Sequence, residues 1–291
     1  MSQRMKGWFS MQVRTTGSPP RMFLVALLLI AATIAVVATA ATAQSAQGKP
    51  AQANAPQLAS GGPQDWDAIL KKHVQGDFFD YAGLAHDRAD LARLDAFLRL
   101  QAEADLSKMS RPEQIAFYIN AYNSCCVKAI LDHYPVHSPH DVDGFFDKPR
   151  FKVAGEELTI SQIEYDRLIA NYKDMRAHFA LVCSDRGCLP LRRAAFRGES
   201  LDADLDATAK RFVSDERQLK VDREKGEIWI SKLFDWYGKK FTADPNRPAE
   251  RPELYLKHWV ADDVRALLES GNYQPRFIDW DWTLNERYGS R

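Results

Sequence analysis

The stretch HFALVCSDRGCLPL, from His178 to Leu191, combines a histidine, two cysteines and a proline with an apolar run. A thiolate and an imidazole are the nucleophile and the base of thiol-dependent hydrolases and acyl-transferases. Two nearby thiols in an exported chain can instead form a disulfide. The candidates for chemistry in this stretch are therefore His178, Cys183 and Cys188.

Strand geometry restricts the pairing of His178 with Cys183. The run AHFALVC, residues 177–183, is apolar on both faces, which is typical of a strand covered on both sides. On a regular strand, His178 and Cys183 face opposite ways and lie about 16 Å apart. A catalytic pair needs hydrogen-bond contact. We therefore expect His178 to act as a base only from across a cleft, or toward Cys188, which follows a turn.

The first 43 residues have the pattern of a signal peptide. Four basic residues precede an uncharged run that begins MFLVALLLIAATIAVV, and A-x-A cleavage sites end at Ala40 and Ala43. We expect cleavage after Ala43 and export, to the periplasm if the source is a Gram-negative bacterium and otherwise out of the cell. An uncleaved anchor is the alternative, because residues 22–43 are long enough to span a bilayer. The membrane would then be contacted only through this segment.

Export bears on the two cysteines, because disulfides persist in oxidising compartments. The loop between Cys183 and Cys188 is short and contains Gly187, which permits a tight turn. We therefore expect an intrachain disulfide between Cys183 and Cys188. A reactive thiol or redox pair is one alternative, and two inert thiols are the other.

Two asparagines lie on a predicted helix, RPEQIAFYINAYNSCCVKAILDHY. The helix begins at a capping box, Ser110 to Glu113, and ends before Pro135. At helical spacing Asn123 falls inside the apolar arc and Asn120 lies at its edge. A buried carboxamide without partners costs about 1–3 kcal/mol. We favour a clamp on neighbouring backbone, and a ligand-orienting amide in a cleft is the alternative.

A histidine-rich loop, DHYPVHSPHDVD, offers the ligand types of zinc or copper sites. It contains His133, His137 and His140 beside Asp141 and Asp143. Prolines interrupt any regular spacing, so we interpret the segment as a solvated loop and predict no metal.

Other motifs carry little chemistry. The aromatic segments LFDWYGKKF and DWDWTLN could line a carbohydrate or peptide cleft, but we expect them to cap a core. No nucleophile elbow, P-loop or dinucleotide fingerprint occurs, so we predict no cofactor.

The elements that must position these residues are mixed in kind. Helical patterns cover 65–75 and 87–104, FKVAGEELTI predicts a hairpin at Gly155, and a second capping box at Ser161 opens a short helix. A helix over 201–215, a hairpin over 219–231 and a helix ending at Gly271 follow. Strand and helix do not alternate strictly. This order predicts an α+β fold, with a helical N-terminal half packed on a small mixed sheet with hairpins.

The domain organisation is simple. Residues 44–63 are rich in Gln, Ala, Gly, Pro and Ser and predict a disordered linker, which leaves 64–291 as one globular domain. Removal of the signal peptide removes four of the 39 basic residues and none of the 39 acidic ones, which leaves a net charge near −4. This charge argues against a nucleic-acid partner. It leaves small molecules and peptides as candidate ligands.

Five blocks follow one another between about residues 106 and 285: FYINAYNSCCVKAILDHYPV, GEELTISQIEYDRLI, HFALVCSDRGCLPLR, LFDWYGKKF and DWDWTLN. In this order they resemble the domain-of-unknown-function family 547, which brings no settled activity with it. The resemblance implies which positions to inspect: Asn120, Asn123, His178, Cys183, Cys188, Pro190 and Lys232. Lys232 becomes a candidate ligand-binding residue on this ground alone.

The chain also departs from the family pattern. Relatives usually carry His where this chain has Tyr165, and Ser-Cys-Pro-Pro where it reads Gly187-Cys188-Leu189-Pro190. A catalytic role for the missing His would make this chain inactive or altered.

Two functions follow as expectations. The first is binding of a small molecule or peptide in a cleft between the Asn120/Asn123 helix and the His178 strand. The alternative is a thiol-dependent hydrolase or acyl-transferase that uses Cys188 or Cys183, with His178 as the base.

Overall fold

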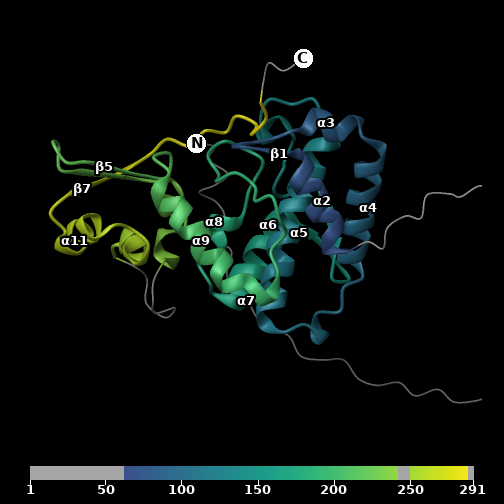
Figure 1. The fold of residues 1–291 in the computed structure, drawn as a ribbon, viewed down its shortest axis with the longest axis horizontal. Helices are drawn as coiled ribbons and strands as arrows, with labels where there is room; N and C mark the ends of the chain where they lie inside the picture. Colours follow the sequence, from purple (N-terminus) through teal and green to yellow (C-terminus); the bar gives the residue numbers. More distant parts are fainter. Residues whose placement is uncertain (1–61, 242–249, 288–291) are drawn as a thin grey trace, which may run out of the picture. The chain divides into compact units, whose positions relative to one another are not determined.

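The computed structural model describes residues 62–241 and 250–287 (Figure 1). All of them belong to one compact unit, residues 54–291. The predicted signal peptide and almost all of the predicted linker lie outside the described residues. Within the described ranges, no helix combines the length and apolar character needed to cross a membrane.

The N-terminal half is helical, as the sequence predicts. It contains α2 (Pro63–His73), α3 (Tyr81–His86), α4 (Arg88–Ala102), η2 (Leu106–Lys108) and α5 (Arg111–Leu131). Helix α4 contacts both α2 and α5 (Figure 1). The capping box that begins α5 is confirmed, because the backbone N–H of Ser110 donates to Glu113 Oε2 (2.7 Å). Nearly every residue from Ile115 to Ile130 is buried, so α5 is the central helix of the core.

The helical segments after α5 are mostly short, with α9 as the longest. They are η3 (Pro139–Asp141), α6 (Ile160–Gln162), the π-helix η4 (Ile163–Ile169), α7 (Ala170–Tyr172), α8 (Ala177–Ala180), η5 (Gly198–Ser200), α9 (Leu201–Ser214), α10 (Leu233–Trp236), η6 (Gly238–Lys240), η7 (Pro252–His258) and α11 (Asp262–Ser270). Helix α9 contacts α5 and α8.

The strands form three small sheets. Strands β1 (Val74–Gln75) and β2 (Phe78–Phe79) are antiparallel, and so are β3 (Arg150–Val153) and β4 (Glu156–Thr159). In the third sheet, β5 (Leu219–Asp222) is antiparallel to β6 (Glu227–Ile230), which pairs in parallel with β7 (Gln274–Phe277). Gly155 has φ +83° in the turn between β3 and β4, where glycine is favoured. The α+β class with a small mixed sheet and hairpins is confirmed.

Two local predictions are wrong. The strand expected over residues 177–183 is absent, because Ala177–Ala180 form the helical turn α8 and the chain continues without a strand partner. A short run that is apolar on all sides cannot be assigned to strand or helix by its periodicity. The second capping box is centred on Thr159 instead of Ser161, since Thr159 Oγ1 accepts a hydrogen bond from Gln162 N (3.2 Å). Ser161 Oγ donates to Asp147 Oδ1 instead (2.8 Å).

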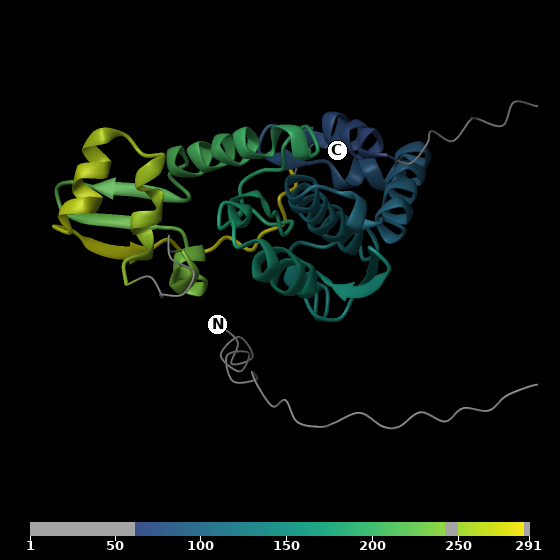
Figure 2. The same ribbon diagram turned by 90° about the horizontal axis from the view of Figure 1, so that it is seen from below.

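The C-terminal segment 278–287, called the strap below, returns from β7 to the helical half, as its yellow trace in Figure 2 shows. It runs beside the loop that carries the cysteines: Arg186 N donates to Thr283 O (2.9 Å) and Gly187 N to Asp281 O (2.8 Å). It also reaches the first hairpin, where Phe79 N donates to Asn285 O (2.8 Å). The strap therefore connects the sheet that contains β7 to the cysteine loop and to the first hairpin.

Candidate functional site

The two asparagines of α5 hold the segment that contains the cysteines. Asn123 Nδ2 donates to Ala180 O (3.1 Å), and Asn123 Oδ1 accepts from Val182 N (2.8 Å). Asn120 makes the same pair of bonds with Phe196, to its carbonyl oxygen (2.8 Å) and from its N–H (2.9 Å). The backbone clamp expected from the sequence is confirmed. A ligand-binding role for either asparagine stays a prediction.

The space between α5 and residues 179–182 is small. A cavity of about 20 Å³ lies there, and Asn123, Phe179, Val182 and Pro190 are among its lining residues. Such a volume holds about one water molecule. The predicted cleft is therefore closed to a larger ligand in this conformation.

Cys183 and Cys188 lie together in the loop that the clamps position. Both are buried free thiols, and their Sγ atoms are 2.9 Å apart. A disulfide bond is about 2.04 Å long. The disulfide expected from the sequence is thus not formed in this structure, because the two sulfurs meet in a hydrogen bond. The backbone N–H of Cys183 also donates to Cys188 Sγ (3.3 Å).

Asp185 completes this cluster from within the same loop. Its side chain is 1% exposed and accepts hydrogen bonds from Cys188 N (3.0 Å), Cys183 Sγ (3.1 Å) and Trp280 Nε1 (3.0 Å). Burial raises the pKa of Asp185 to about 6, although these hydrogen bonds act in the opposite direction. The carboxylate is therefore mostly ionised at neutral pH but holds a proton more readily than an exposed one.

The thiols themselves are not acidic. Burial raises the pKa of Cys188 to about 11, although its hydrogen bonds with the thiol and the backbone N–H of Cys183 lower it. The hydrogen bond with Cys188 and burial hold the pKa of Cys183 well above its usual value. Both cysteines are therefore protonated at neutral pH, unlike the thiolate of a cysteine hydrolase.

His178 lies against a different partner. Its Nδ1 is 3.2 Å from Glu164 Oε1, and its ring stacks on Tyr237 with the centroids 4.7 Å apart. Its Nε2 is buried and forms no hydrogen bond with any described residue. No hydrogen bond joins His178 to Cys183 or Cys188. Burial raises the pKa of Tyr237 well above its usual value, and the charges of Glu164 and of the two cysteines add to this rise. Tyr237 therefore lies near both the His178–Glu164 pair and the cysteines.

The family comparison covers this loop and its supports. Residues 106–213 match the model of a family described as "Protein of unknown function, DUF547". The match confirms, for this segment, the resemblance to the DUF547 family. A search of curated proteins gave no match, and neither did a search of solved structures.

The DUF547 segment contains most of the predicted site residues. Asn120, Asn123, His178, Cys183 and Cys188 all lie inside the matched range, whereas Lys232 and the strap follow it. Lys232 pairs with Asp235 (3.0 Å) and its Nζ lies 5.2 Å from the centroid of the Phe277 ring. These contacts are with α10 and β7, and neither of them involves the cysteines.

Tyr165, the departure from the usual DUF547 pattern, lies on η4. Its hydroxyl donates a hydrogen bond to the hydroxyl of Tyr237, the ring that stacks on His178. Tyr165 thus occupies a half-buried position beside the His178–Glu164 pair, where a histidine would add a second imidazole.

One group of described residues has the donors and the spacing to hold a metal ion. It consists of Cys183, Asp185 and Cys188, whose ligand atoms lie within 4.8 Å of one another. Three donors are one fewer than a structural zinc site uses. Two histidines of the histidine-rich loop have other contacts: His133 Nδ1 lies 3.0 Å from Ala129 O, and the His140 and Trp282 rings are 4.2 Å apart.

Sequence reasoning missed Asp185 and Trp280. Asp185 stands between the two cysteines, so its spacing was an available signal, but Ser-Asp-Arg-Gly also has the composition of an ordinary turn. Trp280 had no such signal, because its contact with the loop depends on the path of the strap. A Cβ added to Gly187 would lie 2.4 Å from the Trp280 ring, so glycine is required for this close packing.

Proposed function

We propose that the protein is exported and that Cys183 and Cys188 form a dithiol–disulfide redox centre, with Asp185 as its proton acceptor. The observation that carries the proposal is the contact of three groups: two thiol sulfurs 2.9 Å apart, and a buried carboxylate 3.1 Å from Cys183 Sγ. A carboxylate with a pKa of about 6 is ionised at neutral pH and can take a proton from a thiol in contact with it.

The exchange has two steps with an external disulfide as the oxidant. Cys188 reacts first, because the backbone N–H of Cys183 donates a hydrogen bond to its sulfur (3.3 Å) and so stabilises the thiolate that forms. Its sulfur attacks the external disulfide, the S–S bond breaks, and the first leaving thiolate takes the Cys188 proton. Asp185 then accepts the proton of Cys183, whose sulfur attacks Cys188. The second leaving thiolate takes that proton, so two electrons and two protons have passed to the external disulfide.

The geometry favours this centre over the other two functions. A thiol hydrolase needs a base bonded to its thiol, whereas His178 contacts Glu164 and no hydrogen bond joins it to either cysteine. The cavity in the predicted ligand cleft has room for about one water. Binding of a small molecule or peptide in that cleft stays a prediction.

The test is a redox titration of the exported, folded protein in mixtures of reduced and oxidised glutathione. Alkylation followed by peptide mass spectrometry should find a single Cys183–Cys188 disulfide that appears in one two-electron transition. Cys125 and Cys126 should remain thiols, because both are fully buried and adjacent side chains on a helix point about 100° apart, which prevents a bond between them. The mature chain should begin at Gln44 if the signal peptide is cleaved as expected.

Variants separate the roles. Cys188→Ser should abolish the transition, whereas the matched control Cys126→Ser should retain it. Asp185→Asn should make the mixed disulfide with glutathione accumulate, because the proton acceptor of the second step is missing. The proposal fails if Cys183 and Cys188 both remain thiols in fully oxidised glutathione while the protein stays folded.

A further inference from the structure

A second feature lies beyond the cysteines, on the same segment of chain. A groove of about 510 Å³ is lined by Val74, Gly76, Leu191, Arg192, Arg193, Ala194 and Arg211. This volume falls within the range of about 300–1,000 Å³ that is usual for small-molecule sites. Three arginines and no acidic residue line it, in a chain whose formal net charge is zero.

Two of these arginines differ in what they can offer a ligand. Arg192 Nη2 donates to Asp204 Oδ1 (2.6 Å) and its Nη1 is buried, so Arg192 contributes mainly its positive charge. Arg193 Nη2 donates to the carbonyl oxygen of Lys71 (2.5 Å), and no described carboxylate pairs with Arg193. Guanidinium groups with free N–H donors bind carboxylates and phosphates in bidentate geometry.

The third arginine has a weak internal partner. Arg211 Nη2 lies 3.3 Å from Asp77 Oδ1, and the same carboxylate lies 3.4 Å from Arg217 Nη2. The Asp77 side chain is 51% exposed at the tip of the β1–β2 hairpin. A ligand oxyanion could therefore replace it at Arg211 at little cost.

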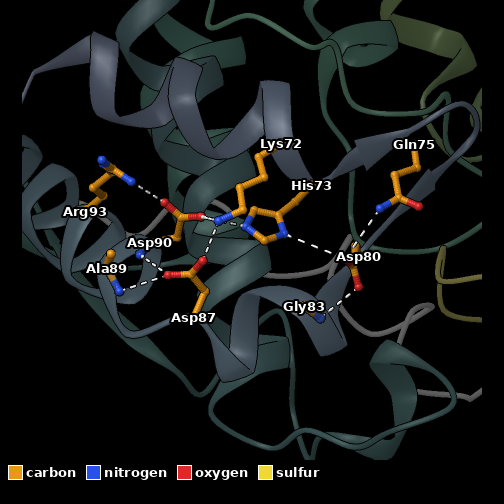
Figure 3. A network of polar contacts seen from close by, with 9 residues as sticks. All are labelled: Lys72, His73, Gln75, Asp80, Gly83, Asp87, Ala89, Asp90 and Arg93. Carbon is orange, nitrogen blue, oxygen red and sulfur yellow. Dashed lines mark hydrogen bonds and ion pairs between the residues drawn. The ribbon is translucent and has the colours of Figure 1, made fainter. Parts of the chain in front are cut away.

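A polar network holds the hairpin wall of the groove in place (Figure 3). His73 Nε2 lies 3.0 Å from Asp90 Oδ2, and Lys72 Nζ lies 2.7 Å from the same atom. Asp80 accepts hydrogen bonds from Gly83 N (2.8 Å) and Gln75 Nε2 (3.4 Å). These contacts tie the end of α2 and strand β1 to α3 and α4, so the wall that contains Val74 and Gly76 is already ordered before a ligand binds.

We infer that this groove binds a small organic oxyanion, either a carboxylate or a phosphate ester. Its charged group contacts Arg192, Arg193 and Arg211, and its apolar part contacts Leu191 and Ala194. Apolar lining beside a few converging polar groups is the usual composition of a small-molecule site.

Calorimetric titration of the purified protein with phenyl phosphate, benzoate and inorganic phosphate tests the inference. We expect phenyl phosphate to bind more tightly than inorganic phosphate, because only the ester has an apolar part. Tighter binding of benzoate than of phenyl phosphate would identify the ligand class as a carboxylate, and the reverse would identify a phosphate ester.

Three variants locate the site. Arg193→Gln should weaken binding of the preferred probe about tenfold, because a charge-assisted hydrogen bond is lost. Arg223→Gln, a matched control that removes an exposed arginine paired with Asp263, should leave affinity unchanged. Asp77→Asn should tighten binding severalfold, because the competing carboxylate is removed.

Three results would each overturn the inference: no probe binds at millimolar concentration, Arg193→Gln and Arg223→Gln weaken binding equally, or Asp77→Asn leaves it unchanged. Arg193 is exposed, so its variants should fold, and thermal unfolding monitored by circular dichroism checks this. Arg193→Lys keeps the charge and should retain part of the affinity.

Discussion

At the scale of single residues, the fold changes the pKa of Asp185 in a way that can be tested. Burial raises its pKa from 3.8 to about 6, so the folded chain holds this proton more tightly than the unfolded chain does. The stability that protonated Asp185 contributes is therefore fully present below about pH 4 and is lost as the pH rises through 6. Burial of this carboxylate thus costs stability at neutral pH, and its hydrogen bonds offset part of that cost.

Replacing Asp185 with Asn should flatten this pH dependence. A shift of about two pKa units corresponds to about 3 kcal/mol. The free energy of unfolding of the wild type minus that of Asp185→Asn should therefore fall by about this amount between pH 3.5 and pH 7.5. Urea denaturation at several pH values measures it, with Asp95→Asn, an exposed residue of α4, as the control. A difference that stays constant with pH would contradict the raised pKa.

At the scale of elements, α5 was the most predictable part of the molecule. Its capping box, its apolar arc and the need to satisfy two asparagines all follow from local rules. The strand expected at residues 177–183 failed for a reason that also involves α5. Ala180 and Val182 bond to the amide of Asn123, and this amide takes the place of a neighbouring strand. A side chain on a distant helix thus decided the backbone conformation of the loop.

Removing that amide should destabilise the protein. In Asn123→Ala the buried N–H of Val182 and carbonyl of Ala180 lose their partner, which should cost about 3 kcal/mol. The matched control is Asn171→Ala, because Asn171 is exposed and its amide bonds only to carbonyls of its own helical segment, such as that of Arg167 (2.9 Å). The control should change stability by less than about 0.5 kcal/mol. Equal denaturation midpoints for the two variants would show that the clamp is dispensable.

At the scale of the whole molecule, the sequence predicts the fold class and the order of elements but not which distant segments meet. The dithiol needs Trp280 from the strap, and the arginine groove needs the first hairpin, the 191–194 segment and α9. No local pattern encodes such contacts, since they depend on tertiary packing. The sequence therefore predicts the pair of cysteines, but it predicts neither the packing of Trp280 over them nor the arginine groove.

The strap should control access to the thiols. Trp280→Ala removes the ring that packs on Gly187 and donates to Asp185, so iodoacetamide should alkylate Cys188 at least about tenfold faster, because local opening becomes easier. Trp280→Phe should have a smaller effect, because a ring remains. The control is Trp229→Ala, since Trp229 lies on β6 and its Nε1 bonds to Glu227. The rates are measured by mass spectrometry at pH 8. Unchanged labelling in Trp280→Ala would mean that the strap does not shield the pair.

The late position of the strap in the chain also has a consequence for biogenesis. Under the export proposed above, a chain that crosses the membrane from its N-terminal end brings Cys183 and Cys188 across before Trp280. During this interval the α5 clamps and the cysteine loop can assemble, but the strap is still missing. An oxidant thus meets an uncovered thiol pair during secretion and a covered one afterwards. Newly made molecules should acquire the disulfide quickly, whereas molecules that were exported in the reduced form should oxidise slowly.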